Sequence, residues 1–456
     1  MTTLFARAPL PVLALLVLSA CAGAETGAGD PLDDAAPAPS MAGATAPAGG
    51  GEPVDGESPP DPLPVEIASE REEEAARRGS EGAPAAGDGA APAPVRIPDR
   101  RPSFDRPEHV RGIYLNKWAA GSPARLEKLV DLARRTEVNS FVIDLKDATG
   151  YLSYASGVPL AREIGATGDV SIRDLPGLLR RLSDEGIWPI ARIVIVKDPL
   201  LAAARPDLAV QDTAGGPWVD RNGSTWLNPW SPEVRDYHLE LAREAAALGF
   251  PEIQWDYVRF ADAPLEDLLR AHYPGRDGRE KAEGIRDFLE ASAALMEELG
   301  VVHTADVFGV TTSARDVGIG QIWERFIDRL DVALPMVYPS HYYRGSFGFQ
   351  HPNAHPYEIV REALKPGLAR SEAVEGAGTI RPWLQDFTMG EPSYGAPEVL
   401  AQIQAAYDVG VREWLLWNPG SRYTEEALMP VGGWVEEPLV RVADRHSSTS
   451  SSRSAS

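Results

Sequence analysis

Cysteine is almost absent from this chain of 456 residues, which contains one, at position 21. A disulfide framework, on which many small exported domains depend, is therefore excluded. Basic residues are also few: 44 Lys and Arg stand against 67 Asp and Glu, which gives a formal net charge of −23. An acidic chain without a basic stretch is poorly suited to nucleic acid or to an anionic lipid surface, so a neutral or cationic substrate fits it better.

Nucleotide-binding loops are a further absence. The sequence contains neither a G-x-G-x-x-G fingerprint nor a Walker loop. The stretch GVTTSARDVGIGQ at 309–321 has the glycine and threonine of a phosphate loop but lacks its lysine and its spacing. We therefore expect no nucleotide and no cofactor.

A long apolar run occurs only at the N-terminus, and it is too short to span a bilayer as a mature helix. Arg7 precedes the apolar stretch 11–18, and small residues follow, which is typical of a secretory signal. The end of this signal, Leu-Ser-Ala-Cys, resembles a bacterial lipobox, which implies lipidation of Cys21 and a signal peptide over residues 1–21. The alternative is an ordinary signal with a chance cysteine. Because Ala22 is not aspartate, the resemblance implies an exported, membrane-anchored lipoprotein of the outer membrane or cell surface if the cell is Gram-negative.

Two segments lack the apolar residues that a core requires. Residues 22–108 are rich in Ala, Pro, Gly and acidic residues, and residues 446–456 are rich in serine. Chains of this composition bury too little apolar surface to offset the entropy lost on folding. The sequence predicts a disordered tether over 22–108, a folded domain over 109–445 and a disordered tail.

Within the folded domain, short apolar runs alternate with helical stretches. The runs cover residues 110–116, 139–146, 189–196, 252–258, 301–308, 331–338, 379–387 and 413–418. Such runs are typical of parallel strands buried on both faces. Ser-Pro pairs at 122–123 and 231–232 mark helix starts, and Gly249 and Gly410 mark helix ends. Eight units of this kind predict an α/β protein with a (β/α)8 TIM barrel, in preference to a doubly wound open sheet.

Polar residues gather at the C-terminal ends of these runs, where the active sites of TIM barrels lie. Asp256 illustrates the pattern, because it interrupts the apolar stretch EIQWDYVRF. Burial of an unpaired carboxylate is costly, so Asp256 is expected either at the mouth of the barrel or in an ion pair.

Two carboxylates on adjacent strands are the groups that cleave glycosidic bonds. One donates a proton to the leaving oxygen, and the other attacks the sugar or activates water. Asp256 and Asp306, on the fourth and fifth strands, are the predicted catalytic pair, with Asp144 and Asp386 as alternatives. The predicted substrate-binding residues are Tyr114, Asp144, Lys146, Lys197, Arg259, Tyr338, His341, Trp383, Asp386, Trp417 and Asn418.

The competing interpretation is a layer of structural ion pairs between these strand ends. In that arrangement basic side chains only neutralise the aspartates. The basic residues would be Arg192, Lys146, Lys197 and Arg259, and the acidic residues Asp144, Asp256 and Asp306.

Three histidines, at positions 341, 351 and 355, share one loop. Their spacing matches no zinc pattern, so we expect no metal site. Contact with substrate is the preferred interpretation of this loop.

Several segments resemble a known family in order over residues 109–430. They include VRGIYLN, FVIDLKDATGYLSYAS, EIQWDYVRF, ADVFGVTTSA, IRPWLQDF and WLLWNPGSRYT. They resemble the glycoside hydrolase family long known as a domain of unknown function and grouped with the TIM-barrel glycosidases. The resemblance implies the barrel fold and a carbohydrate-active role, but no particular substrate. The blocks QWDYV, PMVYP and LLWN are also similar to chitinase-type hydrolases. Val258 stands where those enzymes carry an acidic glutamate, which argues against their acetamido-assisted mechanism.

The function predicted from the sequence is hydrolysis of a cell-envelope or extracellular polysaccharide. The partners expected are this glycan and, through the lipid anchor, a membrane, with no nucleic acid and no nucleotide. The alternatives are a non-catalytic carbohydrate-binding lipoprotein on a degenerate barrel, and a metal-dependent deacetylase.

Overall fold

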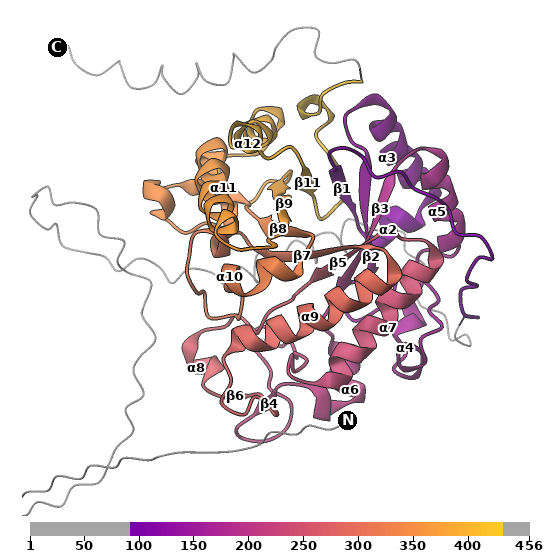
Figure 1. Cartoon of the computed structure of the whole chain (residues 1–456), viewed down its shortest axis with the longest axis vertical. Helices are drawn as coiled ribbons and strands as arrows, with labels where there is room; N and C mark the ends of the chain where they lie inside the picture. The colour runs from indigo at the N-terminus through magenta and orange to yellow at the C-terminus, as the bar shows by residue number, and fades with distance from the viewer. Residues whose placement is uncertain (1–91, 432–456) are drawn as a thin grey trace, which may run out of the picture. The chain divides into compact units, whose positions relative to one another are not determined.

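The computed structural model describes residues 92–431, which form a barrel of parallel strands surrounded by helices (Figure 1). The barrel strands are β1 (Arg111–Leu115), β2 (Ser140–Lys146), β3 (Trp188–Val194), β5 (Glu252–Asp256), β7 (Val302–Phe308), β8 (Val332–Met336), β9 (Thr379–Ile380), β10 (Trp383–Gln385) and β11 (Trp414–Trp417). Their order in the sheet is β10-β11-β1-β2-β3-β5-β7-β8-β9, and a further pairing of β10 with β8 closes the ring.

The predicted (β/α)8 fold is confirmed, and each of the eight apolar runs contributes to the barrel. The run at 379–387 is divided into β9 and β10, which together fill the seventh position. Pro382 lies between them, and proline cannot donate a hydrogen bond to a neighbouring strand. The break therefore follows from the sequence of that run.

The helices connect successive strands on the outside of the barrel (Figure 1). They are α2 (Lys117–Gly121), α3 (Pro123–Arg135), α4 (Pro159–Glu163), α5 (Leu175–Asp184), α6 (Pro199–Ala204), α7 (Pro232–Leu248), α8 (Leu265–Leu268), α9 (Lys281–Leu299), α10 (Trp323–Phe326), α11 (Pro356–Glu372) and α12 (Ala396–Asp408). A small antiparallel pair, β4 (Gln211–Asp212) and β6 (Ala271–His272), lies apart from the barrel sheet.

Two predicted helix boundaries show how local sequence positions these elements. Ser231 precedes α7, and its hydroxyl accepts a hydrogen bond from the backbone N–H of Val234 at 3.3 Å. The same helix ends at Gly249, whose φ of 119° is readily adopted only by glycine. Ser122 precedes α3 in the same way, but its side chain makes no capping bond.

Buried apolar side chains form two clusters, as expected for strands that alternate between two faces. The larger cluster fills the layer between strands and helices. The smaller one lies inside the barrel and consists of Val110, Tyr114, Val142, Trp188, Ile190, Val332, Leu334, Tyr338, Trp383, Phe387, Leu415 and Trp417. The interior is thus a packed core whose upper layers carry the polar residues described below.

Two residues that precede the predicted domain start at 109 contact the barrel domain. Val95 donates a backbone hydrogen bond to the carbonyl of Ala155 at 2.6 Å, and Phe104 packs against both apolar clusters. Both residues are apolar, but they lie within the segment 22–108, whose average composition is typical of a disordered chain. The predicted signal peptide with Cys21, most of the tether, residues 432–445 and the tail at 446–456 lie outside the described residues. Across residues 92–431, no helix combines the length and the apolar character needed to cross a membrane.

Candidate active site

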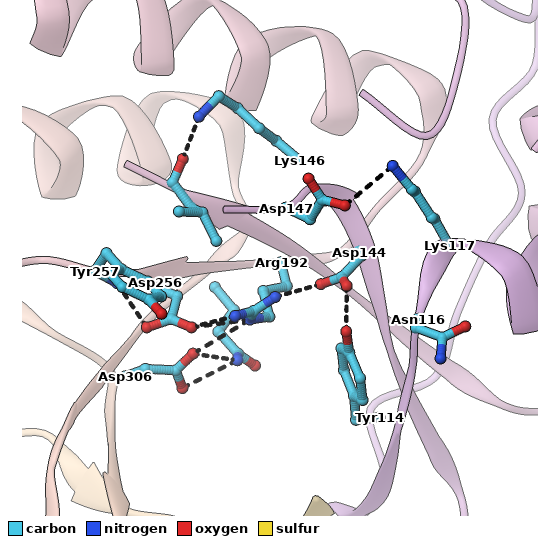
Figure 2. Close-up of polar contacts among 12 residues, drawn as sticks. Tyr114, Asn116, Lys117, Asp144, Lys146, Asp147, Arg192, Asp256, Tyr257 and Asp306 are labelled. Carbon is cyan, nitrogen blue, oxygen red and sulfur yellow. Dashed lines mark hydrogen bonds and ion pairs between the residues drawn. The ribbon is translucent and has the colours of Figure 1, made fainter. Parts of the chain in front are cut away.

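The centre of the barrel mouth is occupied by the guanidinium of Arg192, which projects inward from β3 (Figure 2). Its Nη1 donates to Asp144 Oδ1 at 2.5 Å, and its Nε donates to Asp256 Oδ2 at 3.0 Å. Its Nη2 also donates to Asp256. The Nε lies 3.9 Å from Asp306 Oδ2. One buried cation therefore faces three aspartates, which lie on β2, β5 and β7.

Aromatic rings close one side of this cluster. Tyr114 and Trp417 stack with ring centroids 3.9 Å apart, and the Arg192 guanidinium lies 5.6 Å and 5.2 Å from their respective centroids. The Tyr114 hydroxyl donates to Asp144. Both rings thereby hold the guanidinium by cation–π contact and restrict its orientation.

Asp306 is a buried residue of β7. The strand ends at Phe308, as does the predicted run 301–308, so Asp306 lies two residues before the strand end, and only 2% of its surface is exposed. Its oxygens accept hydrogen bonds from Gln254 Nε2 at 3.0 and 2.8 Å and from Trp383 Nε1 at 2.6 Å. Burial, and then the negative charge of Asp256, raise the pKa of Asp306 well above its usual range. This carboxyl group is therefore the one that retains a proton most readily.

Asp256 ends β5 and is followed by a strained residue. Tyr257 has a φ of 55°, which is unfavourable for a side chain of this size, and its backbone N–H donates to Asp256 Oδ1 at 2.6 Å. Strained backbone of this kind is common beside functional groups. The Arg259 guanidinium lies 4.8 Å from the Tyr257 ring centroid, and the Lys197 ammonium lies 5.6 Å from it. The turn after Asp256 is thus lined with positive charge.

Asp144 completes the acidic set, on β2. Burial raises its pKa, although the Arg192 charge and the Tyr114 hydroxyl act in the opposite direction. Two of the three aspartates around Arg192 therefore have raised pKa values.

Lys146 points away from this cluster (Figure 2). Its Nζ lies 3.0 Å from Asp198 Oδ2 and donates to the carbonyl of Val194 at 2.8 Å. A simple two-residue alternation from Asp144 would direct Lys146 inward. The register between β2 and β3 shifts between these two residues, and an irregularity of this kind redirects the side chains that follow it.

The remaining predicted binding residues form two groups beyond the Arg192 cluster. The Asp386 carboxylate accepts from Thr424 N at 2.9 Å and Thr424 Oγ1 at 2.7 Å, while Asn418 Nδ2 donates to the Asp386 carbonyl at 2.5 Å. These contacts fasten the segment after β11. Tyr338 packs edge-on against His341, with ring centroids 5.1 Å apart, and burial lowers the pKa of His341 to about 4.

Sequence reasoning did not include Arg192 or Gln254 among the site residues. Both interrupt apolar runs in the same way as Asp256, so the signal was present in the sequence. A second ion group was also missed: Lys117 Nζ lies 3.1 Å from Asp147 Oδ2 and 2.7 Å from Asp169 Oδ2. Figure 2 shows Lys117 and Asp147 directed away from Arg192.

The ion-pair interpretation holds for Arg192, which contacts Asp144 and Asp256 directly. Lys146 instead pairs with Asp198. The Arg259 guanidinium stacks on the rings of Trp226, Tyr257 and Phe308, at 4.9, 4.8 and 4.8 Å from their centroids.

Across residues 92–431, no group of three or more His, Cys, Asp or Glu side chains is arranged to hold a metal ion.

Comparison with known families identifies this barrel. Residues 112–423 match the family described as "Putative glycosyl hydrolase domain". This match covers more than half of the chain, and the chain belongs to that family. No curated protein matches the chain.

Several solved structures are similar to parts of the chain. A hypothetical protein from Ruminiclostridium thermocellum is 41% identical, with 43% of this chain and 97% of that one covered and a TM-score of 0.39. The PgaB (BpsB) glycoside hydrolase domain from Bordetella bronchiseptica is 13% identical, with 69% and 95% covered and a TM-score of 0.48. The α-galactosidase TtGalA from Thermus thermophilus is 16% identical, with 73% and 61% covered and a TM-score of 0.42. The family assignment rests on the sequence match.

Proposed function

We propose that this protein hydrolyses glycosidic bonds in a cell-envelope or extracellular polysaccharide, with Asp256 and Asp306 as the catalytic carboxyl groups. The observation that carries the proposal is their position around one guanidinium nitrogen: Arg192 Nε lies 3.0 Å from Asp256 and 3.9 Å from Asp306. Membership of a glycosyl hydrolase family supports the reaction class.

The two carboxyl groups lie in different environments. Asp256 accepts hydrogen bonds from the Arg192 guanidinium and from the backbone N–H of Tyr257, which fix the orientation of its carboxyl group at the end of β5. Asp306 is buried in the barrel and faces the charge of Asp256, which raises its pKa. We assign Asp256 as the nucleophile or base and Asp306 as the proton donor, because glycosidases divide their two roles in this way.

The test is a screen of polysaccharides, including peptidoglycan and exopolysaccharide, with the wild-type chain and its Asp256→Asn and Asp306→Asn variants. Both variants should lose about 10²–10⁴-fold in turnover while still binding the glycan, because the neutral amide keeps the size of the side chain. Asp144→Asn identifies the donor: if it abolishes turnover while Asp306→Asn does not, the assignment of Asp306 is wrong.

Asp147→Asn is the matched control. Asp147 is also ion-paired, with Lys117, but it lies outside the Arg192 cluster. It should retain turnover close to wild type, so that a loss confined to Asp256 and Asp306 reports chemistry rather than the removal of any ion-paired carboxylate.

A second candidate function is carbohydrate binding without catalysis. It is favoured by the hydrogen bonds that already engage both oxygens of Asp306, and by the guanidinium that lies between Asp144 and Asp256. A binding protein would retain a bound glycan unchanged on prolonged incubation, and Asp256→Asn would alter only its affinity.

We also propose that Cys21 is lipidated and anchors the protein to a membrane, on the basis of the lipobox-like Leu-Ser-Ala-Cys sequence. The wild-type chain should incorporate labelled fatty acid and sediment with membranes. Cys21→Ser should do neither, and equal labelling of the two proteins would refute the anchor.

A further inference from the structure

A pocket of ≈ 530 Å³ lies between the loop after β5 and the loop after β7. Its volume is within the range of small-molecule binding sites. Its lining residues are Arg276, Glu280, Lys281, Ala282, Arg315, Asp316, Gly318, Gly320, Ile322 and Arg325. Four of these side chains are basic and two are acidic, so the pocket is locally positive in a chain with a net charge of −23.

The two acidic residues are already engaged. Glu280 Oε2 lies 3.2 Å from Arg325 Nη2, and Asp316 Oδ1 accepts from the backbone N–H of Gly318 at 2.7 Å. Arg315 is exposed and makes no hydrogen bond within the described residues. With four basic and two acidic side chains, the walls of the pocket keep a formal excess of positive charge.

Lys281 adds to this imbalance at the start of α9. Its Nζ donates to the carbonyl of Gly318 at 2.7 Å, a neutral acceptor. Burial, and then the like charge of Arg276, lower the pKa of this amine, although the charges of Asp316 and Asp262 act in the opposite direction. An oxyanion in the pocket would relieve both effects.

The pocket is connected to the candidate active site through the same two loops. Phe260 N donates to the carbonyl of Ile319 at 2.8 Å. Gln321 bridges the loops, because its amide donates to the Val258 carbonyl at 3.1 Å and accepts from Phe308 N at 2.9 Å. These loops follow the strands of Asp256 and Asp306, so a ligand held here lies on the same face of the barrel.

We propose that this pocket binds an oxyanion group of the glycan, so that the substrate is an acidic polysaccharide that bears carboxylate or sulfate. This inference rests on the proposed carbohydrate function. It also revises the expectation of a neutral or cationic substrate. The net charge of the chain acts at long range, where salt screens charges more than about 8 Å apart, whereas the pocket acts at contact.

The experiment uses the full chain and three probes: sodium sulfate, tri-galacturonate and the methyl ester of tri-galacturonate. Calorimetry should show the acid binding at least about tenfold more tightly than the ester, which has the same rings without charge. The double variant Arg276→Gln/Arg315→Gln should remove this preference, and its exposed positions make misfolding unexpected. Arg243→Gln is the control, because Arg243 pairs with Glu298 on the exposed surface of α7 and α9.

Each outcome has a distinct meaning. Equal affinity for acid and ester, unchanged in the double variant, would overturn the proposal. Sulfate binding that depends on the two arginines, without any preference for the acid glycan, would indicate a site for free anions and refute the substrate assignment. Hydrolysis measured in parallel separates the two proposals. Turnover without a preference for the acid glycan would refute only the proposed oxyanion site. A preference for the acid glycan without turnover would refute only the proposed hydrolase activity.

Discussion

At the scale of single residues, the arrangement depends on Arg192. Its side chain is almost completely buried, and it neutralises carboxylates that would otherwise be buried and unpaired. Loss of one partner from a buried ion pair is much more costly than loss of an exposed pair, because the remaining charge stays desolvated. The same guanidinium is therefore a structural element and part of the candidate site.

We expect Arg192→Ala to lower the free energy of unfolding by about 3–5 kcal/mol, measured by urea denaturation. Arg192→Lys should recover part of this, since it keeps the charge but loses the planar fork that reaches two aspartates. Arg243→Ala breaks an exposed ion pair with Glu298 and should have little effect. If Arg192→Ala lowers the free energy of unfolding no more than Arg243→Ala does, Arg192 does not stabilise the cluster of aspartates.

The raised pKa of Asp306 makes a prediction about pH. The folded protein keeps Asp306 protonated at pH values at which the unfolded chain, where the pKa of this group is near 3.8, has lost the proton. The protonated Asp306 therefore stabilises the fold fully below pH 3.8. This stabilisation is lost as the pH rises through the raised pKa of the folded protein. Asp306→Asn stays neutral throughout, so its stability relative to wild type should increase from pH 4 to pH 8.

This comparison needs denaturation midpoints of both proteins across the pH range. Asp236→Asn, an exposed site on α7, is the control and should run parallel to wild type. Parallel curves for Asp306→Asn as well would mean that Asp306 is ionised in the folded protein.

At the scale of elements, the chain provides two Ser-Pro helix starts that differ in one hydrogen bond. Ser231 accepts from Val234 N, whereas the Ser122 side chain makes no such bond. Ser231→Ala should lower the free energy of unfolding by about 1 kcal/mol, because it leaves a helix N–H without its partner. In the same urea assay, Ser122→Ala should lower the free energy of unfolding by clearly less. Equal losses would show that the hydroxyl at position 231 contributes nothing specific.

At the scale of the whole molecule, the boundary of the folded domain can be tested by truncation. A chain of residues 109–431 lacks the Val95 backbone bond and the Phe104 side chain, which packs against the interior of the barrel and its outer layer. It should be about 1–3 kcal/mol less stable to urea than a chain of residues 92–431. Phe104→Ala in the longer chain should reproduce part of this loss. Equal stability of the two chains would support the predicted boundary at 109.

The sequence by itself determined the barrel, because the signals for strands and helix ends are local. Apolar runs of the right length, Ser-Pro starts and glycine ends lie within a few residues of the elements they define. The same local reasoning predicted that Asp256 lies at a strand end, since a carboxylate inside an apolar run is unusual at that position alone, and Asp256 is the last residue of β5.

Only the tertiary structure decided which of these side chains meet. Arg192 lies opposite Gln254 in the register of β3 and β5, yet its guanidinium reaches Asp256, two residues further along that strand. A register shift in β2 turned Lys146 outward, and Asp306 meets the side chains of Gln254 and Trp383 from two other strands. Register depends on neighbours about 50 residues away in the chain. For this reason the sequence predicts which strands carry the candidate site residues but not which side chains meet.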